Sequence, residues 1–127
     1  MKISDFSEDF YSIYQVFCKE NSINPYDIKS LKHGVVLEDN DGVLGFGFLS
    51  IDGYHANIKH IVHDLSVDKE EVDNVYFSII EGLLFLAKKL SCKYVCHLDS
   101  SRDLSDRYEK LGLMVYDRNV TVYGRRL

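Results

Sequence analysis

The sequence predicts a single α/β domain built on a mixed β-sheet. The chain has 127 residues, close to the commonest size of one domain. Short strand-like segments are separated by turn signals such as DNDG at 39–42. A long apolar segment over 75–90 follows three such strands, and a helix of that length can connect parallel strands. We therefore expect one domain over residues 1–127.

Periodicity and turn residues predict the order of the elements. Apolar side chains recur at 10, 13, 14 and 17, the spacing of one helix face, which predicts a helix over 7–20. Asn24-Pro25 breaks the chain, and a short helix over 26–31 follows. The other expected elements are strands over 34–38, 43–51 and 58–67, a helix over 75–90, a strand over 93–98, a helix over 103–111 ending at Gly112, and strands over 113–116 and 119–123.

Alternation assigns side chains to the faces of two of these strands. Gly45 and Gly47 lie two apart, so they share a face, where they indicate a close approach of another element. In the strand over 58–67, alternation predicts Ile58 and Val62 on one face, with Ile61, Leu65 and Val67 on the other. The helix over 75–90 is apolar nearly all round and is expected to be buried on most sides.

Composition and charge narrow the classes of partner. The formal net charge of -5 argues against nucleic acid or an anionic membrane, because such binding depends on clustered Lys and Arg. The N-terminal sequence is acidic and has no long apolar run, and three cysteines form no disulfide framework. We therefore expect a cytoplasmic protein, either monomer or homodimer, in a reducing environment.

Two local motifs sharpen the prediction of the fold. LSVDK at 65–69 stands before the apolar helix, and RYEKLGL at 107–113 ends the last expected helix. These segments resemble the LxVxP and LYEKLGF motifs of the GNAT acyl-CoA N-acyltransferases, and the resemblance covers roughly residues 34–123. It implies a GNAT-like mixed, mostly antiparallel twisted sheet with a central splay between strands 58–67 and 93–98, flanked by about four helices.

The resemblance also implies a cofactor, acetyl-CoA or another acyl-CoA. In the family, a loop of the pattern Q/R-x-x-G-x-G/A presents backbone N–H groups to the pyrophosphate at a helix start. Counted from Val67, the positions that correspond to Q/R, G and G/A of this pattern are Val72, Val75 and Phe77, and none of them is basic or glycine. The segment implied to hold the cofactor comprises Leu65, Ser66, Val67, Val72, Asn74, Val75, Tyr76 and Phe77.

The same segment carries acidic residues at 68, 70, 71 and 73, which repel a pyrophosphate. A like-charge pair at ~4 Å costs on the order of 4 kcal/mol at an effective dielectric of about 20. We expect weak or undetectable CoA binding. The cofactor is held mainly by its pantetheine arm along the strand over 58–67, or it is not bound.

Acyl transfer from a thioester to an amine needs a base, an oxyanion donor and an acid for the leaving thiolate. The resemblance assigns the acid to Tyr108; the alternative is an aromatic side chain packed beneath the sheet. Candidate bases are His63 and Asp64, with His60 close by, and the alternative is a half-exposed polar strand. His63 shares a face with Leu65, and His60 shares the other with Asp64, so only one pair can face a cleft.

A metal site is not expected. His55, His60 and His63, or Cys92, Cys96 and His97, are the groups of ligands that the sequence offers, and neither has the spacing of a structural zinc site.

Three functions remain open. The first is a diverged acyl-CoA-dependent N-acyltransferase that acts on a small-molecule or protein amine. The second is a non-catalytic GNAT-fold protein that binds a protein or small ligand through its cleft or an exposed sheet edge. The third is a small α/β interaction domain unrelated to acyl transfer. A fold alone does not decide among them, because function depends on the site.

Overall fold

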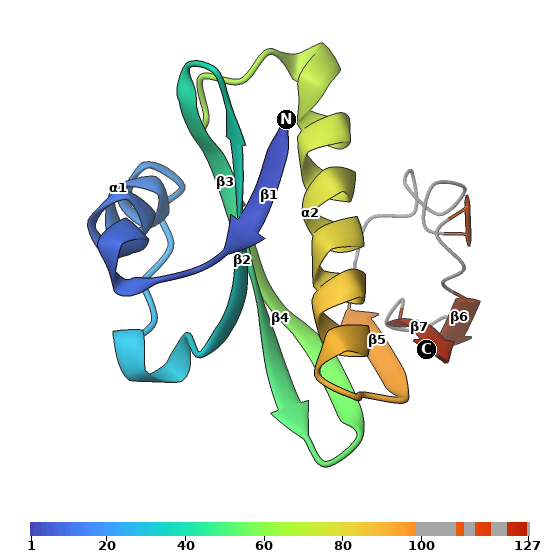
Figure 1. The fold of residues 1–127 in the computed structure, drawn as a ribbon. Helices are drawn as coiled ribbons and strands as arrows, with labels where there is room; N and C mark the ends of the chain where they lie inside the picture. The colour runs from blue at the N-terminus through green and yellow to red at the C-terminus, as the bar shows by residue number, and fades with distance from the viewer. Residues whose placement is uncertain (99–108, 111–113, 118–121, 127) are drawn as a thin grey trace.

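The computed structural model describes residues 1–98, 109–110, 114–117 and 122–126, which form a seven-stranded sheet with helices on both faces (Figure 1). The strands are β1 (Lys2–Asp5), β2 (His33–Asp39), β3 (Gly42–Asp52), β4 (His55–His63), β5 (Tyr94–Leu98), β6 (Met114–Asp117) and β7 (Val122–Arg126). The helices are the α-helices α1 (Tyr11–Glu20) and α2 (Lys69–Lys89) and the 3-10 helices η1 (Glu8–Phe10) and η2 (Ile28–Ser30).

The sheet is mixed and mostly antiparallel, as predicted. Its strand order is β1-β2-β3-β4-β5-β7-β6. Only β4 and β5 run parallel among these neighbours. Parallel neighbours require a crossover connection, and α2 supplies it. The predicted role of the long apolar helix is therefore confirmed.

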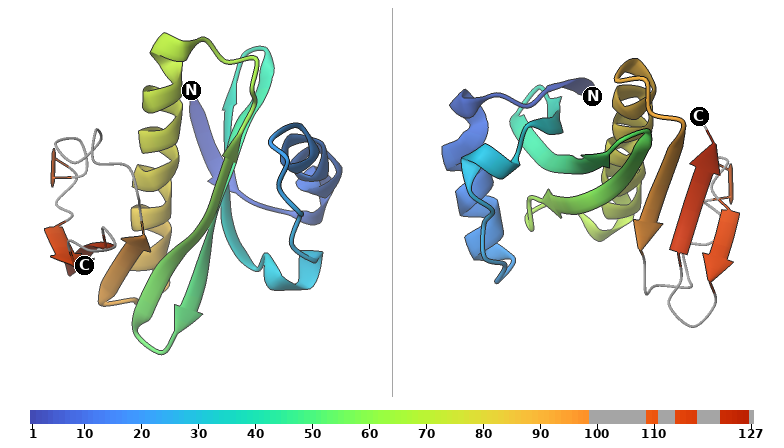
Figure 2. Two further views of the ribbon diagram at one scale, coloured as in Figure 1. Left: turned by 180° about the vertical axis from the view of Figure 1, so that it is seen from behind. Right: turned by 90° about the horizontal axis from the view of Figure 1, so that it is seen from below.

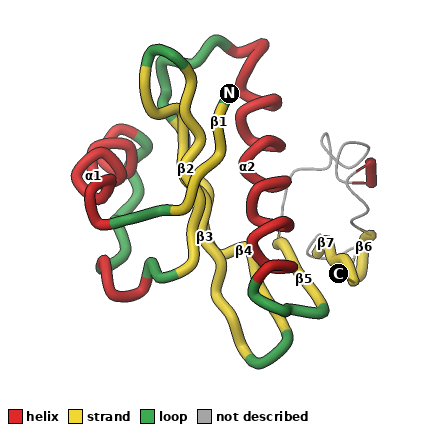
Figure 3. Tube along the Cα trace, viewed as in Figure 1, coloured by secondary structure: helices red, strands yellow, loops and turns green. Residues whose placement is uncertain are grey.

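The two α-helices lie on opposite faces of the sheet, and each covers its own core (Figures 2 and 3). The core beneath α2 is mainly aliphatic, with Ile79, Ile80 and Leu83 fully buried against β2, β3 and β4. The core beneath α1 is mainly aromatic, and Tyr14 packs edge-on against Phe46 at 5.8 Å between ring centroids. Burying each such large apolar side chain contributes about 1.5–3 kcal/mol. The sheet is thus held from both sides.

Most of the apolar side chains of α2 from residue 75 onward are buried, as the apolar pattern predicted. Phe85 is the exception, with 73% of its surface exposed. It lies four residues after Glu81 and three before Lys88, so it belongs to the polar stripe of the helix. No helix in the described part of the chain is long and apolar enough to cross a membrane.

Both α-helices end in a left-handed residue that turns the chain sharply. At the end of α2, Ser91 has φ 63°, its N–H donates to Lys88 O at 3.0 Å, and the N–H of Cys92 donates to Ala87 O at 3.0 Å. These two bonds define a Schellman cap. Ser22, with φ 57°, ends α1 in the same way. The cap after α2 turns the chain back so that β5 can run beside β4.

Several elements differ from the prediction. The edge strand β1 was not predicted, because only four residues form it and its side chains are mostly exposed. The segment over 26–31 forms a 3-10 turn rather than an α-helix. About four helices were expected, whereas the described residues contain two α-helices. Of the expected helix over 103–111, only Glu109 and Lys110 are described, and both are helical. Gly112 lies outside the described residues.

The predicted close approach at Gly45 and Gly47 is present, and α2 makes it. A Cβ atom at Gly47 would overlap Ile79 Cγ2 and lie 2.8 Å from Leu83 Cδ1. A Cβ atom at Gly45 would lie 2.8 Å from Ile79 Cδ1. Both glycines therefore face α2, and their lack of a side chain sets the distance between helix and sheet.

We predict that Gly47→Ala destabilises the protein by about 1–3 kcal/mol, because the added methyl group overpacks a buried contact. Urea unfolding monitored by circular dichroism measures the change. The control is Ser50→Ala on the exposed side of the same strand, which should shift stability by less than about 0.5 kcal/mol. Equal unfolding midpoints for Gly47→Ala and wild type would contradict the packing described here.

Candidate functional site

The splay expected from the sequence would begin where the short parallel ladder between β4 and β5 ends. The two strands pair over four residue pairs, from His55 with Tyr94 to Ile58 with His97. β4 then continues to His63 without a β5 partner among the described residues. Within the described part of the chain, main-chain N–H and C=O groups on that side of β4 thus have no strand partner, and such groups can pair with an extended ligand.

A β-bulge lies at the start of this splay. Phe48 on β3 pairs with His60, whereas the next residue, Leu49, pairs with Ile58. Lys59 is therefore an extra residue in β4. A bulge of this kind changes which face the following side chains occupy.

Because of the bulge, side chains of β4 lie on other faces of the sheet than alternation predicted. Ile58 is buried in the core beneath α2, but Val62 is buried in the core beneath α1. The prediction that these two residues share a face is wrong, because strict alternation does not hold across Lys59. Ile61 packs against the α2-side core, opposite Val62.

The helix α2 begins earlier than expected. It starts at Lys69, directly after Asp68, rather than near residue 75. The N–H groups of Glu71 and Val72 donate to Asp68 O at 2.8 and 3.1 Å, so the first turn is closed. Acidic residues favour a helix start because they complement the helix dipole. The polar segment that the sequence suggested as a loop is thus helical.

This start places the residues corresponding to the family's phosphate loop inside the helix. Val75 and Phe77 are 2% and 6% exposed, and both belong to the core beneath α2. In an α-helix each N–H group bonds to the carbonyl four residues earlier, so those N–H groups are already used. Val72 and Tyr76 are half-buried, Asn74 is exposed, and Tyr76 packs against Phe77 at 5.5 Å.

The loop between β4 and α2 is held by its own hydrogen bonds. The Asp64 Oδ1 atom accepts from Ser66 N at 2.9 Å and from Ser66 Oγ at 2.8 Å. His63 Nδ1 lies 2.9 Å from Asp64 O, and Asn21 Nδ2 donates to His63 O at 3.0 Å. Leu65 and Ser66 are exposed. The two candidate bases His63 and Asp64 are adjacent and ordered at the end of β4.

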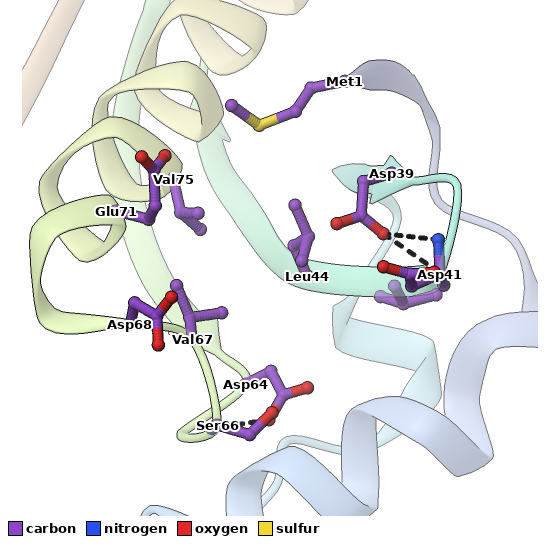
Figure 4. Close-up of a pocket in the computed structure, with 12 residues that line it drawn as sticks. Met1, Asp39, Asp41, Leu44, Asp64, Ser66, Val67, Asp68, Glu71 and Val75 are labelled. Atoms are coloured by element: carbon purple, nitrogen blue, oxygen red, sulfur yellow. Dashed lines mark hydrogen bonds between the residues drawn. The ribbon is translucent and has the colours of Figure 1, made fainter.

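A pocket of about 420 Å³ lies between this loop, the start of α2 and the β2–β3 hairpin (Figure 4). Its walls include Ser66, Val67 and Val75 from the predicted segment. No described lining residue has a basic side chain, and five carboxylate side chains line the pocket: Asp39, Asp41, Asp64, Asp68 and Glu71. Such a lining disfavours an anionic ligand.

His60 occupies a different environment, inside the aromatic core beneath α1. Its ring lies 5.7 Å from Tyr14, 5.3 Å from Tyr26 and 6.2 Å from Phe48. The Nε2 atom is 3.8 Å from Cys18 Sγ. Burial lowers the pKa of His60, and the Lys59 charge lowers it further. The imidazole is therefore neutral at neutral pH.

The structure brings together one pair from the two groups of ligands considered for zinc. His55 Nε2 lies 3.1 Å from Cys96 Sγ across the β4–β5 pairing. Burial raises the pKa of the Cys96 thiol, which favours the protonated form over the thiolate that binds metals. Cys92 is buried in the core beneath α2. Tyr108 lies outside the described residues.

Comparison with protein-family models and with curated proteins finds no match to this sequence. Solved structures match nearly the whole chain. A Mycobacterium tuberculosis protein in complex with CoA has a TM-score of 0.78 at 12% identity, covering 100% of this chain and 99% of that one. The ribosomal-protein-S18-alanine N-acetyltransferase of Escherichia coli has a TM-score of 0.75 at 14% identity, covering 98% and 92%.

A GCN5-related N-acetyltransferase from Kribbella flavida has a TM-score of 0.71 at 11% identity, covering 99% of this chain and 97% of that one. The chain has the GNAT fold. The resemblance read from the two sequence motifs is therefore confirmed at the level of the fold. Identities of this size concern architecture, and the chemistry must be argued from the site.

The sequence resemblance implies a phosphate-binding segment before the long helix, which is α2 in this structure. Here its first turn carries Glu70 and Glu71. The sequence had identified the missing glycines and the acidic charge. The sequence did not reveal that Asp39 and Asp41 of the β2–β3 hairpin line the same pocket as Glu71, because the two aspartates were recognised only as turn residues. The available sequence signal of the bulge was the pair Lys59-His60, because two consecutive polar residues interrupt the alternation of the strand.

We predict that the free energy of unfolding falls as the pH is lowered below about 6.5, the ordinary pKa of histidine. The lowered pKa of His60 means that the unfolded chain binds the proton more readily, so stability rises with pH in this window. The stabilisation is present above about pH 6.5, and it is lost as the pH falls through the lowered pKa of His60 in the folded protein.

Urea unfolding of wild type and His60→Gln at several pH values between about 7.5 and 5 measures this effect. The variant should show a smaller loss of stability over that range. Identical pH dependence in the two proteins would remove His60 as the cause.

Proposed function

We propose that this protein is an acyl-CoA-dependent N-acyltransferase that holds its donor mainly through the pantetheine arm. The observation that supports the proposal is the short β4–β5 ladder, beyond which β4 has no β5 partner for residues 59–63 among the described residues. The GNAT fold and the N-acetyltransferases among its structural neighbours support an acyl donor in this place. The acceptor is an amine on a small molecule or a protein.

The reaction requires three groups around the thioester. The amine nitrogen attacks the carbonyl carbon, a C–N bond forms, the C–S bond breaks, and the amine loses a proton while the thiolate gains one. Main-chain N–H groups of β4 beyond Ile58 are suitable donors for the developing oxyanion. Tyr108 is the proposed acid for the thiolate.

His63 is the better of the two proposed bases. Its Nδ1 atom lies 2.9 Å from the carbonyl oxygen of Asp64, which only accepts hydrogen bonds, so Nδ1 carries the proton. The neutral ring then has an unprotonated Nε2 atom that can accept a proton. The Asp64 carboxylate, by contrast, already accepts two hydrogen bonds from Ser66.

The start of α2 is poorly suited to the cofactor's phosphates. The N–H groups of Glu71 and Val72 are bonded to Asp68, and Glu70 and Glu71 occupy the first turn. A pyrophosphate placed there gains few hydrogen bonds and meets like charge. The affinity should therefore reside in the pantetheine arm, which is uncharged and can pair with β4.

We predict that acetyl-CoA and S-acetyl-pantetheine, which lacks the nucleotide and its phosphates, bind within about threefold of each other, with Kd above roughly 100 μM for acetyl-CoA. Isothermal titration calorimetry measures both. Added salt should strengthen acetyl-CoA binding, because it screens the repulsion. Acetyl-CoA binding that is tenfold or more tighter than that of S-acetyl-pantetheine would contradict the proposal.

Charge-neutral variants sharpen this test. Glu70→Gln with Glu71→Gln should strengthen acetyl-CoA binding and leave S-acetyl-pantetheine binding unchanged. The matched control is Glu8→Gln with Glu20→Gln, at the two ends of the segment that contains α1, which changes net charge equally. An equal effect of both double variants would indicate a general charge effect rather than a local one.

A second candidate is a non-catalytic GNAT-fold protein, which the early start of α2 favours. The helix carries valine and phenylalanine at the two positions counted as the glycines of the family's loop, and both side chains belong to the core beneath α2. Absence of binding by both acetyl-CoA and S-acetyl-pantetheine would support this candidate and remove the acyltransferase.

We predict that Tyr108→Phe lowers turnover by roughly 10²–10⁴-fold if Tyr108 is the general acid. The ring is retained, so stability should change by no more than about 1 kcal/mol. Thiol release from acetyl-, propionyl- and succinyl-CoA with a panel of amines measures turnover, and urea unfolding verifies the fold. A fully active variant would remove Tyr108 from the mechanism.

A further inference from the structure

A second pocket, of about 310 Å³, lies where η2 meets β2, β3 and β4. Its lining is basic, in contrast to the acidic pocket at the start of α2. Three lysines and a histidine contribute to it, together with serine and backbone groups: Lys29, Ser30, Lys32, His33, Leu49, Ser50, Ile51 and Lys59. None of these residues is acidic, although the chain has 20 acidic and 15 basic residues.

The Lys59 side chain is held in place before any ligand arrives. Its Nζ atom lies 4.1 Å from the centroid of the Tyr26 ring, a cation–π distance. The same atom donates to Ser30 O at 3.4 Å. Lys59 is the extra residue of the β4 bulge, so its position is tied to the sheet. An ammonium group that is already ordered loses less conformational freedom on binding an anion.

The positive charge of this pocket is not neutralised by neighbouring carboxylates. Within the described residues, the recorded ion pair joins Lys89 and Asp5 at 3.9 Å, and none involves Lys29, Lys32 or Lys59. Asp27, the nearest acidic residue in sequence, accepts from the main-chain N–H of Lys29 instead. Like charges gathered around one cavity attract an anion, and lysine is a common ligand of phosphate and carboxylate groups.

We propose that the pocket formed by Lys29, Lys32, His33 and Lys59 is an oxyanion-binding site for a carboxylate or phosphate group. Lys59 is the first β4 residue beyond the pairing with β5, so it belongs both to the pocket and to the part of β4 that extends past the β4–β5 ladder. We extend this proposal by assigning the oxyanion to the amine acceptor, and this extension rests on the proposed acyltransferase function. Binding of the oxyanion itself does not require acyl transfer.

The test is a titration of the ¹⁵N-labelled full chain, without acyl-CoA, followed by amide chemical shifts. One arm uses inorganic phosphate and the other sodium acetate, each at constant ionic strength set with sodium chloride. We expect saturable shifts at residues 29–33, 49–51 and 59 in at least one arm. The arm that saturates at lower concentration identifies the class of oxyanion.

Two double variants decide whether the pocket is responsible. Lys32→Gln with Lys59→Gln should weaken binding by about tenfold or more, because two of the charged donors are lost. Lys19→Gln with Lys69→Gln removes the same charge elsewhere and should change binding less than about twofold. Circular dichroism verifies folding, and Lys32→Gln alone replaces the first variant if that one unfolds.

Non-saturating shifts spread over lysines across the surface, or equal losses in the two double variants, would overturn the proposal. Because the readout is binding without a donor, its failure is distinct from failure of the acyltransferase proposal. Saturable binding with no turnover would retain the oxyanion site and remove only its assignment to an acceptor.

Discussion

The packing of α2 on the sheet is the contact on which the rest of the structure depends. Gly45 and Gly47 leave β3 without side chains where Ile79 and Leu83 approach. This contact seats the helix that connects β4 to β5, and so makes those two strands parallel. The parallel ladder is short, and β4 extends beyond it to His63. The candidate donor site is thus a consequence of helix–sheet packing.

The bulge at Lys59 is the second constraint, and it divides β4 into two functional parts. Before it, side chains alternate between the α2-side core and the open face of the sheet. After it, His60 and Val62 enter the aromatic core beneath α1. The bulged residue itself reaches Tyr26 and the basic pocket. One extra residue therefore places a half-buried neutral histidine and an ordered lysine next to each other, and both lie against the Tyr26 ring.

Charge is distributed unevenly over the two ends of the β3–β4 pair. The acidic pocket lies by the start of α2 and the β2–β3 hairpin, and the basic pocket lies by η2. A ligand with both a cationic amine and an anionic group would experience opposite fields at these two places. The separation also explains why the negative net charge of the chain does not describe the basic pocket.

The sequence by itself determined the α/β class, the succession of strands along the chain from β2 onward, the crossover helix, the glycine contact and the resemblance to the GNAT fold. These follow from periodicity, turn residues and motifs, which are local. Only the tertiary structure decided where α2 starts and which face His60 occupies. It also brought Asp39 and Glu71 together around one pocket, and Lys32 and Lys59 around another. A one-residue bulge moves the following side chains to the opposite face of the sheet without changing the composition, and a pocket joins residues that are distant in sequence. A local sequence pattern therefore predicts neither feature.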